Sequence, residues 1–290
     1  MACLSSPRPH RGLALLAVLW ITAALSVLVA GMVYQVRGET QMARMQLERA
    51  TIQPLMAGAL RMAARDLPAR PEAGSRAVTL VYRIGDHHLT VEAIPLNGFI
   101  SLSSAGESLL VDMFVYGARL DPDGARLLAQ TLVAHRQTLP EGFVSRRQLH
   151  DIPGMERDIY DSIAPLVVPQ RVTGGQINPE AAPAPVLRVL ARGDDAVVQR
   201  ILETRRNPDG QWRTDGLETR HLLASRARAW VVHVEYHQAN WRWRQGQIHA
   251  PAGLPGGRHW QLLDPLHRIQ AHSSITALSS VPCCNPSNKV

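Results

Sequence analysis

The chain has 290 residues with a formal net charge of +7, and 46% of its residues are hydrophobic. This length provides for one large or two small domains with cores of their own. The 31 basic residues comprise 30 arginines and one lysine, Lys289. They are scattered along the chain and form no long run of basic residues, which disfavours a nucleic-acid-binding surface. The three cysteines, Cys3, Cys283 and Cys284, form neither a disulfide framework nor a zinc motif.

The N-terminus combines a basic leader, residues 1–12, with an uncharged stretch at 13–36. About 24 residues of helix reach about 36 Å, enough to cross a hydrocarbon core of about 30 Å, so we predict a transmembrane helix over 13–36. The leader ends in Arg-Gly before the apolar stretch, whereas a secretory signal peptide is cleaved after it. Cleavage between Gly12 and Leu13 and a plain uncleaved anchor are both compatible with this pattern.

Residues 37–67 continue as an amphipathic helix. Apolar side chains recur at spacings of three and four from Met42 to Ala63, which predicts one apolar stripe that needs a packing partner. Pro54 removes a backbone hydrogen bond and predicts a kink, and Pro68 helps to end the helix.

Strand patterns lie on both sides of a helical middle region. Strand-like runs at 78–84 and 89–94, joined by a turn, fall within a first strand segment at 75–97. The strongest alternation, at 230–237, falls within a second strand segment at 223–270. The remaining tail, residues 271–290, is rich in Ser, Pro and Asn and is predicted to be disordered.

The region between the strands, residues 98–222, carries signals for helix starts. Asp121-Pro122 places a capping carboxylate before a proline at the first helical position, and Ser145 with Gln148 forms a capping box. The sequence therefore predicts an α+β fold. A long N-terminal transmembrane helix packs on an antiparallel β-sheet, and an all-α domain, parts of which resemble helix-hairpin-helix or SAM-like units, is inserted between the strands.

The segment from Ser145 to Ala164 is similar to a helix-hairpin-helix, a unit that often binds the DNA backbone through amides of a glycine-rich hairpin. That use needs a second glycine two residues after the first, but Glu156 follows Gly154 at this spacing. Because a carboxylate repels a phosphate, packing within the helical domain is favoured. A membrane-anchored DNA-binding protein stays an alternative.

Signals for metal or catalytic chemistry are weak. His233, Glu235 and His237 lie on one face of a predicted strand, where a solvated polar face explains them as well as a metal site does. The sequence contains no Gly-x-Ser-x-Gly, phosphate loop, dinucleotide fingerprint or His-Glu-x-x-His. We therefore expect no enzyme activity, no catalytic residue, no cofactor and no metal site.

With this organisation, the stretch from Arg11 to Trp20 resembles the N-terminus of K-type minor pseudopilins of type II secretion systems, the general secretion pathway protein K family. The resemblance implies a pilin-like fold and a leader cut after Gly12 by a prepilin peptidase, which also methylates the new N-terminus at Leu13. Most pseudopilins carry Glu as the fifth residue after the cut. The K type lacks it, and here that residue is Ala17.

Three later segments resemble the family in the same order: Gly98–Leu102, Phe143–Met155 and Gly174–Leu187. Two departures concern calcium, which family members can bind in the insertion. Ser101 and Ser103 stand where the family usually has Asp and Asn, and residues 137–141 replace an acidic cluster. These departures argue against a calcium site in this chain.

The resemblance implies a single-pass protein of the bacterial inner membrane with most of the chain in the periplasm. Its implied role is a minor pseudopilin at the tip of the type II secretion pseudopilus, which starts or caps assembly for protein export across the outer membrane. The implied partners are the minor pseudopilins I and J and the prepilin peptidase, with no nucleic acid. A minor-pilin-like assembly protein of type IV pili, which shares this N-terminus, is a further alternative.

Overall fold

The structure, a computed structural model, describes residues 11–206, 214–238, 241–250 and 260–270. Most of the predicted leader and the whole predicted tail at 271–290 lie outside the described residues. The chain divides into two compact units, Met1–Leu55 and Met56–Val290. The boundary between them falls inside the helical segment predicted at 37–67.

Helix α1 (Arg11–Asp66) is the longest element and contributes to both units. In the first unit its large apolar side chains between Val18 and Met32 are exposed where they are described, with Trp20 at 69%. Within the described residues, no helix is both long enough and apolar enough to span a membrane, and the predicted transmembrane helix at 13–36 is not confirmed. The helix continues through Pro54 and ends at Asp66, two residues before Pro68.

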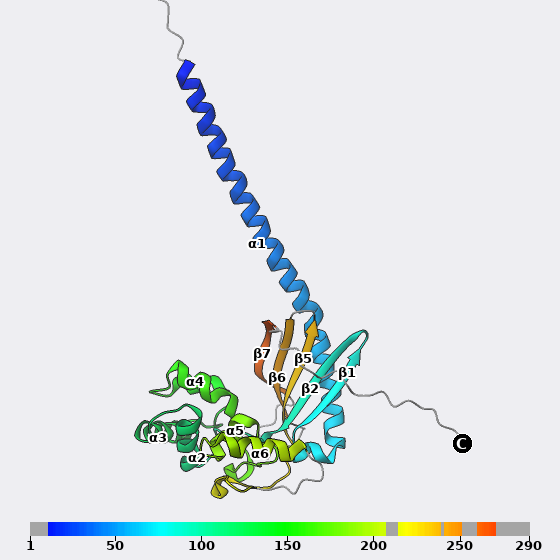
Figure 1. Cartoon of the computed structure of the whole chain (residues 1–290), viewed down its shortest axis with the longest axis vertical. Helices are drawn as coiled ribbons and strands as arrows, with labels where there is room; N and C mark the ends of the chain where they lie inside the picture. Colours follow the sequence, from blue (N-terminus) through cyan, green and yellow to red (C-terminus); the bar gives the residue numbers. More distant parts are fainter. Residues whose placement is uncertain (1–10, 207–213, 239–240, 251–259, 271–290) are drawn as a thin grey trace, which may run out of the picture. The chain divides into compact units, whose positions relative to one another are not determined.

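The second unit contains a five-stranded antiparallel sheet in the order β1-β2-β5-β6-β7 (Figure 1). The strands are β1 (Val78–Ile84), β2 (His87–Pro95), β5 (Trp230–Gln238), β6 (Trp241–His249) and β7 (Trp260–Gln270). The predicted strands at 78–84, 89–94 and 230–237 are confirmed. The first hairpin is tighter than predicted, because Ile84 pairs with His87 and Gly85 adopts a left-handed φ of 60°.

One face of this sheet packs on the last turns of α1. Ala59 and Ala63 are fully buried there, and a Cβ at Gly58 would lie 3.2 Å from the Cδ1 of Ile84, so small residues permit a close approach. The hydroxyl of Tyr82 donates to Asp66 Oδ2 at 3.0 Å. The C-terminal part of the predicted apolar stripe is therefore used inside the second unit.

The insertion lies between β2 and β5, and Figure 1 shows its helices grouped beside one end of the sheet. Its helices are α2 (Glu107–Asp112), α3 (Pro122–Thr138), α4 (Arg157–Ile163), α5 (Ala184–Leu190) and α6 (Asp195–Arg206), with a π-helical turn η4 (Met113–Gly117) after α2. Two short parallel strands, β3 (Ile100–Ser101) and β4 (Val167–Val168), were not predicted. The insertion has its own hydrophobic core, which includes the fully buried Phe114, Leu132 and Leu149.

Short 3₁₀ helices connect these elements: η1 (Leu67–Ala69), η2 (Pro71–Gly74), η3 (Leu96–Gly98), η5 (Arg146–Asp151), η6 (Ala164–Leu166), η7 (Thr173–Gly175) and η8 (Thr219–His221). Both predicted helix starts are confirmed. Asp121 accepts hydrogen bonds from the amides of Asp123 and Gly124, and Ser145 with Gln148 forms the capping box of η5. The fold is α+β, with an antiparallel sheet and a mainly helical insertion.

Candidate functional site

Two asparagines build the junction through which the chain enters and leaves the insertion. The Nδ2 of Asn97 donates to the carbonyl of Ser225 at 2.8 Å. The Nδ2 of Asn178 lies 3.1 Å from the same carbonyl and 2.9 Å from that of Ser75. The backbone N–H of Asn178 also donates to the backbone carbonyl of Asn97 at 2.7 Å, and both asparagine side chains are buried. Asn178 lies in the last of the segments that carry the resemblance, and Asn97 directly precedes the first, in which a Cβ at Gly98 would lie 2.6 Å from the carbonyl oxygen of Ala181.

A second link joins the insertion to the last strand of the sheet through Arg146. Its Nε donates to the carbonyl of Val167 at 3.0 Å, and its Nη1 lies 3.3 Å from Asp264 Oδ1 on β7. The Arg146 side chain is only 10% exposed. Burial lowers the pKa of Arg146, and the charge of Asp264 opposes that shift. The ion pair joins a buried arginine to a half-buried aspartate, in two segments that no local sequence pattern connects.

His233 lies beside that ion pair on the same face of the sheet. Burial, followed by the charge of Arg244, lowers the pKa of His233 to about 4, so the imidazole is neutral at neutral pH. Among the described residues, no hydrogen-bond partner faces its Nδ1. The glycine at position 246 makes room for both side chains, because a Cβ there would lie 3.0 Å from the Nδ1 of His233 and 2.6 Å from Asp264 Oδ2.

The three candidate metal ligands, His233, Glu235 and His237, share this face of the sheet, but Glu235 forms ion pairs there instead of joining a metal site. Glu235 Oε1 lies 3.5 Å from the Nε of Arg244, and Glu235 Oε2 lies 3.7 Å from the Nε2 of His237. In the described part of the chain, no group of three or more His, Cys, Asp or Glu side chains is placed to hold a metal ion. Glu235 and His237 fit the alternative interpretation, a solvated polar face, whereas His233 is buried and does not.

Two backbone amides of the hairpin between η5 and α4 are already hydrogen-bonded within the protein. The amide of Met155 donates to the carbonyl of Ile152 at 3.1 Å, and the amide of Glu156 donates to that of Gly154 at 3.0 Å. Gly154 adopts a φ of 85°, and the exposed Glu156 precedes the first residue of α4. A phosphate at this place would meet a carboxylate and amides that are already bonded, so the geometry disfavours DNA binding.

Sequence reasoning missed a third link, between α2 and η8. Asp112 Oδ2 lies 2.9 Å from the Nε2 of His221 and 3.2 Å from the Nη2 of Arg220. Burial alone raises the pKa of Asp112, but hydrogen bonds and charge from these two residues lower it overall. The neighbouring basic residues at 220 and 221 are visible in the sequence, but their acidic partner is more than a hundred positions away.

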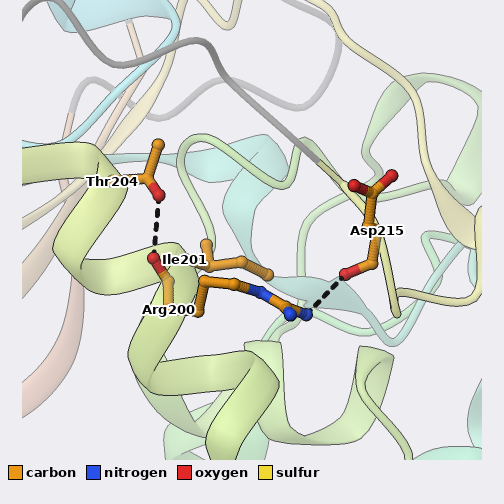
Figure 2. A pocket seen from close by; sticks show the side chains of 4 residues that line it. All are labelled: Arg200, Ile201, Thr204 and Asp215. Atoms are coloured by element: carbon orange, nitrogen blue, oxygen red, sulfur yellow. Dashed lines mark hydrogen bonds between the residues drawn. The ribbon is translucent and has the colours of Figure 1, made fainter.

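A small cavity lies against α6, lined by Arg200, Ile201, Thr204 and Asp215 (Figure 2). Its volume is about 170 Å³, below the range of about 300–1,000 Å³ typical of ligand pockets. The Nη2 of Arg200 donates to the carbonyl of Asp215 at 3.1 Å, and the Oγ1 of Thr204 donates to the carbonyl of Arg200 at 2.9 Å. These polar groups brace the backbone instead of converging on a ligand.

The predicted cleavage residues Gly12 and Leu13 and the atypical fifth residue Ala17 lie in the first two turns of α1, which begins at Arg11. Their side chains are not among those that the structure describes. Their roles therefore stay predictions.

The fold places the chain in a class of α+β proteins in which a long N-terminal helix ends on an antiparallel sheet that carries a helical insertion. No family model and no curated protein sequence matches the chain. Among solved structures, it is similar to a chain of the GspK-GspI-GspJ complex from the type 2 secretion system of enterotoxigenic Escherichia coli. The similarity covers 82% of this chain and 100% of that chain, with 13% identity and a TM-score of 0.44.

Proposed function

We propose that this protein is a minor pseudopilin of a type II secretion system, which starts or caps assembly at the tip of the pseudopilus. The observation that supports the proposal is the division of α1, a helix of 56 residues, into an exposed apolar part and a part packed on the sheet. Its first part exposes apolar side chains, and its last turns are packed on an antiparallel sheet. Exposed apolar surface of this extent is costly in water, and a bilayer or neighbouring filament subunits would cover it.

The K type is supported by the residue at position 17. A carboxylate within a bilayer is costly unless it is paired, for example with the N-terminal amine of a neighbouring subunit. A subunit with Ala17 offers no carboxylate to a subunit above it, while its own amine can still meet the glutamate of a subunit below. The insertion between β2 and β5 adds bulk that would hinder stacking overhead. Both features suit a subunit that ends the filament.

The proposal includes a location and partners. We expect a single pass through the bacterial inner membrane over residues 13–36, with most of the chain in the periplasm. The expected partners are the minor pseudopilins I and J and the prepilin peptidase that removes residues 1–12. The expected role is structural, with neither enzyme activity nor a cofactor. A type IV minor pilin would share the N-terminus, and neighbouring genes for a secretin, an ATPase and other secretion-type pseudopilins would distinguish the two.

Leader processing tests this proposal directly. Co-expression with a prepilin peptidase should shorten the chain by the twelve residues before Leu13, as measured by intact-mass spectrometry. The substitution Gly12→Val should block the cut, because a branched side chain crowds the scissile bond.

Gly38→Val is the matched control, since Arg37-Gly38 repeats the same dipeptide after the uncharged stretch. It should leave processing unchanged. A wild-type chain that keeps its full mass in the presence of an active peptidase would contradict the family assignment.

A further inference from the structure

Three serines fasten the loop at the start of the insertion to the chain that follows β4. Each hydroxyl oxygen lies at hydrogen-bond distance from a backbone carbonyl: Ser101 at 2.7 Å from Gln170, Ser103 at 2.7 Å from Pro169 and Ser104 at 2.8 Å from Val172. Ser101 and Ser103 are buried. Their hydroxyl protons are thus committed to oxygens of the protein itself.

Each of the same hydroxyl oxygens also accepts a hydrogen bond from a backbone amide. The amides of Ser104, Phe143 and Val172 each donate at 3.1 Å, respectively to the oxygens of Ser101, Ser103 and Ser104. The bond from Phe143 brings the segment after residues 137–141 against Ser103. A Cβ at Gly142, the residue that directly follows 137–141, would lie 2.9 Å from the Oγ of Ser103, so the end of the second departure from the family pattern lies next to the first.

Arg136, in the last turn of α3, supplies a positive charge to this loop. Its Nη1 lies 2.9 Å from the carbonyl oxygen of Ala105 and 3.3 Å from that of Leu102. Burial, together with the charge of Arg171, lowers the pKa of Arg136. A guanidinium nevertheless stays charged in proteins, so the two carbonyls face a permanent cation.

The oxygen atoms around this loop do not fit a calcium site. Calcium takes six to eight oxygen ligands and favours carboxylates among them. Here the side-chain oxygens are neutral hydroxyls that already donate and accept hydrogen bonds, and the guanidinium of Arg136 donates to the carbonyls of Leu102 and Ala105. Residues 137–141 contribute one carboxylate, that of the exposed Glu141. A divalent ion would also meet the repulsion of Arg136.

We propose that Arg136 and the three serines replace a bound cation in this chain. The guanidinium neutralises the loop carbonyls, the hydroxyls close the polar gap, and the insertion folds without a divalent metal. The comparison with a bound cation rests on the family resemblance, as the proposed function does, but the test concerns only the stability of the insertion and can fail while the secretion function holds.

The test compares thermal unfolding of the full-length chain in EGTA and in millimolar calcium chloride. Wild-type Tm should differ by less than about 1 °C between the two. Arg136→Ala should lower the Tm by about 3–8 °C, because two buried carbonyls lose a charged donor. Arg126→Ala is the matched control, since Arg126 lies exposed on the same helix in an ion pair with Asp123, and its loss should lower the Tm by about 2 °C at most.

A wild-type Tm that rises by more than about 3 °C with calcium, or stoichiometric calcium binding in calorimetry, would overturn the proposal. So would an Arg136→Ala variant that is no less stable than Arg126→Ala. If Arg136→Ala does not fold, Arg136→Lys serves instead. The lysine ammonium keeps the positive charge but lacks the planar, forked donors of a guanidinium. The Tm of Arg136→Lys should therefore fall below that of wild type and stay insensitive to calcium.

Discussion

His233 makes the stability of the sheet depend on pH. The pKa of the folded imidazole is about 4, against 6.5 for the ordinary side chain, mainly because of burial. The unfolded chain thus binds a proton more readily than the folded one. The contribution of the neutral, buried His233 to the free energy of unfolding is therefore fully present above pH 6.5 and is lost as the pH falls towards 4.

The substitution His233→Gln should weaken this dependence. Between pH 7.5 and pH 5 the wild type should lose on the order of 1–2 kcal/mol more unfolding free energy than His233→Gln, as measured by urea denaturation. The exposed His237 provides the control, because His237→Gln should keep the wild-type slope. Equal slopes for all three proteins would show that His233 does not titrate with unfolding.

Other charged groups face His233, and they are shared by all three proteins. Arg244, Asp264, Arg146 and His267 contribute to its electrostatic environment. Burial raises the pKa of Glu92, the cross-strand neighbour of His233, which gives a pH dependence of the opposite sign. The comparison between variants isolates the imidazole because these contributions largely cancel.

At the scale of elements, the junction at Asn178 should be sensitive to charge. Asn178→Asp keeps the shape but replaces a donor with a carboxylate oxygen that faces the carbonyls of Ser75 and Ser225. Asn178 is 2% exposed, so we expect a loss of about 1–3 kcal/mol at neutral pH from urea unfolding midpoints. The exposed Gln137 gives the matched swap, and Gln137→Glu should change stability by less than about 0.5 kcal/mol. A loss as small as that of the control would contradict a structural role for the amide.

Local patterns predicted the elements better than the contacts among them. The caps at Asp121 and Ser145 depend on residues within three positions, and both are confirmed. The strands β1, β2 and β5 follow from alternation alone. The strands β3 and β4 have two residues each, too few for any period to show, and they pair across more than sixty positions.

The candidate site shows the same limit. The substitutions at Ser101 and Ser103 were visible as departures from the family, but the guanidinium of Arg136 that completes their loop was not. Arg136 resembles any arginine at a helix end, and only the fold brings it to the carbonyls of Leu102 and Ala105. The pair Arg146–Asp264 was hidden for the same reason.

At the scale of the whole molecule, the apolar surface offered to partners is smaller than the sequence predicted. The predicted stripe runs from Met42 to Ala63, but Leu60 and Ala63 are buried in the second unit. Met42 and Leu47 remain exposed, at 57% and 70%. If the protein caps a pseudopilus, these residues belong to the surface on which an I-type or J-type partner packs.

Fragment 38–290 retains this stretch and the whole second unit, and it should form a 1:1:1 complex with cognate I-type and J-type partners without assembling into filaments. Leu47→Glu should weaken the complex about tenfold or more, because a charge at an apolar helix contact must be desolvated. Val81→Glu is the control, since Val81 is 66% exposed on β1, away from this helix stretch in the sequence. Gel filtration with light scattering measures both outcomes. A stable homopolymer, or no complex at micromolar concentration, would contradict the cap, and equal effects of the two variants would move the contact away from Leu47.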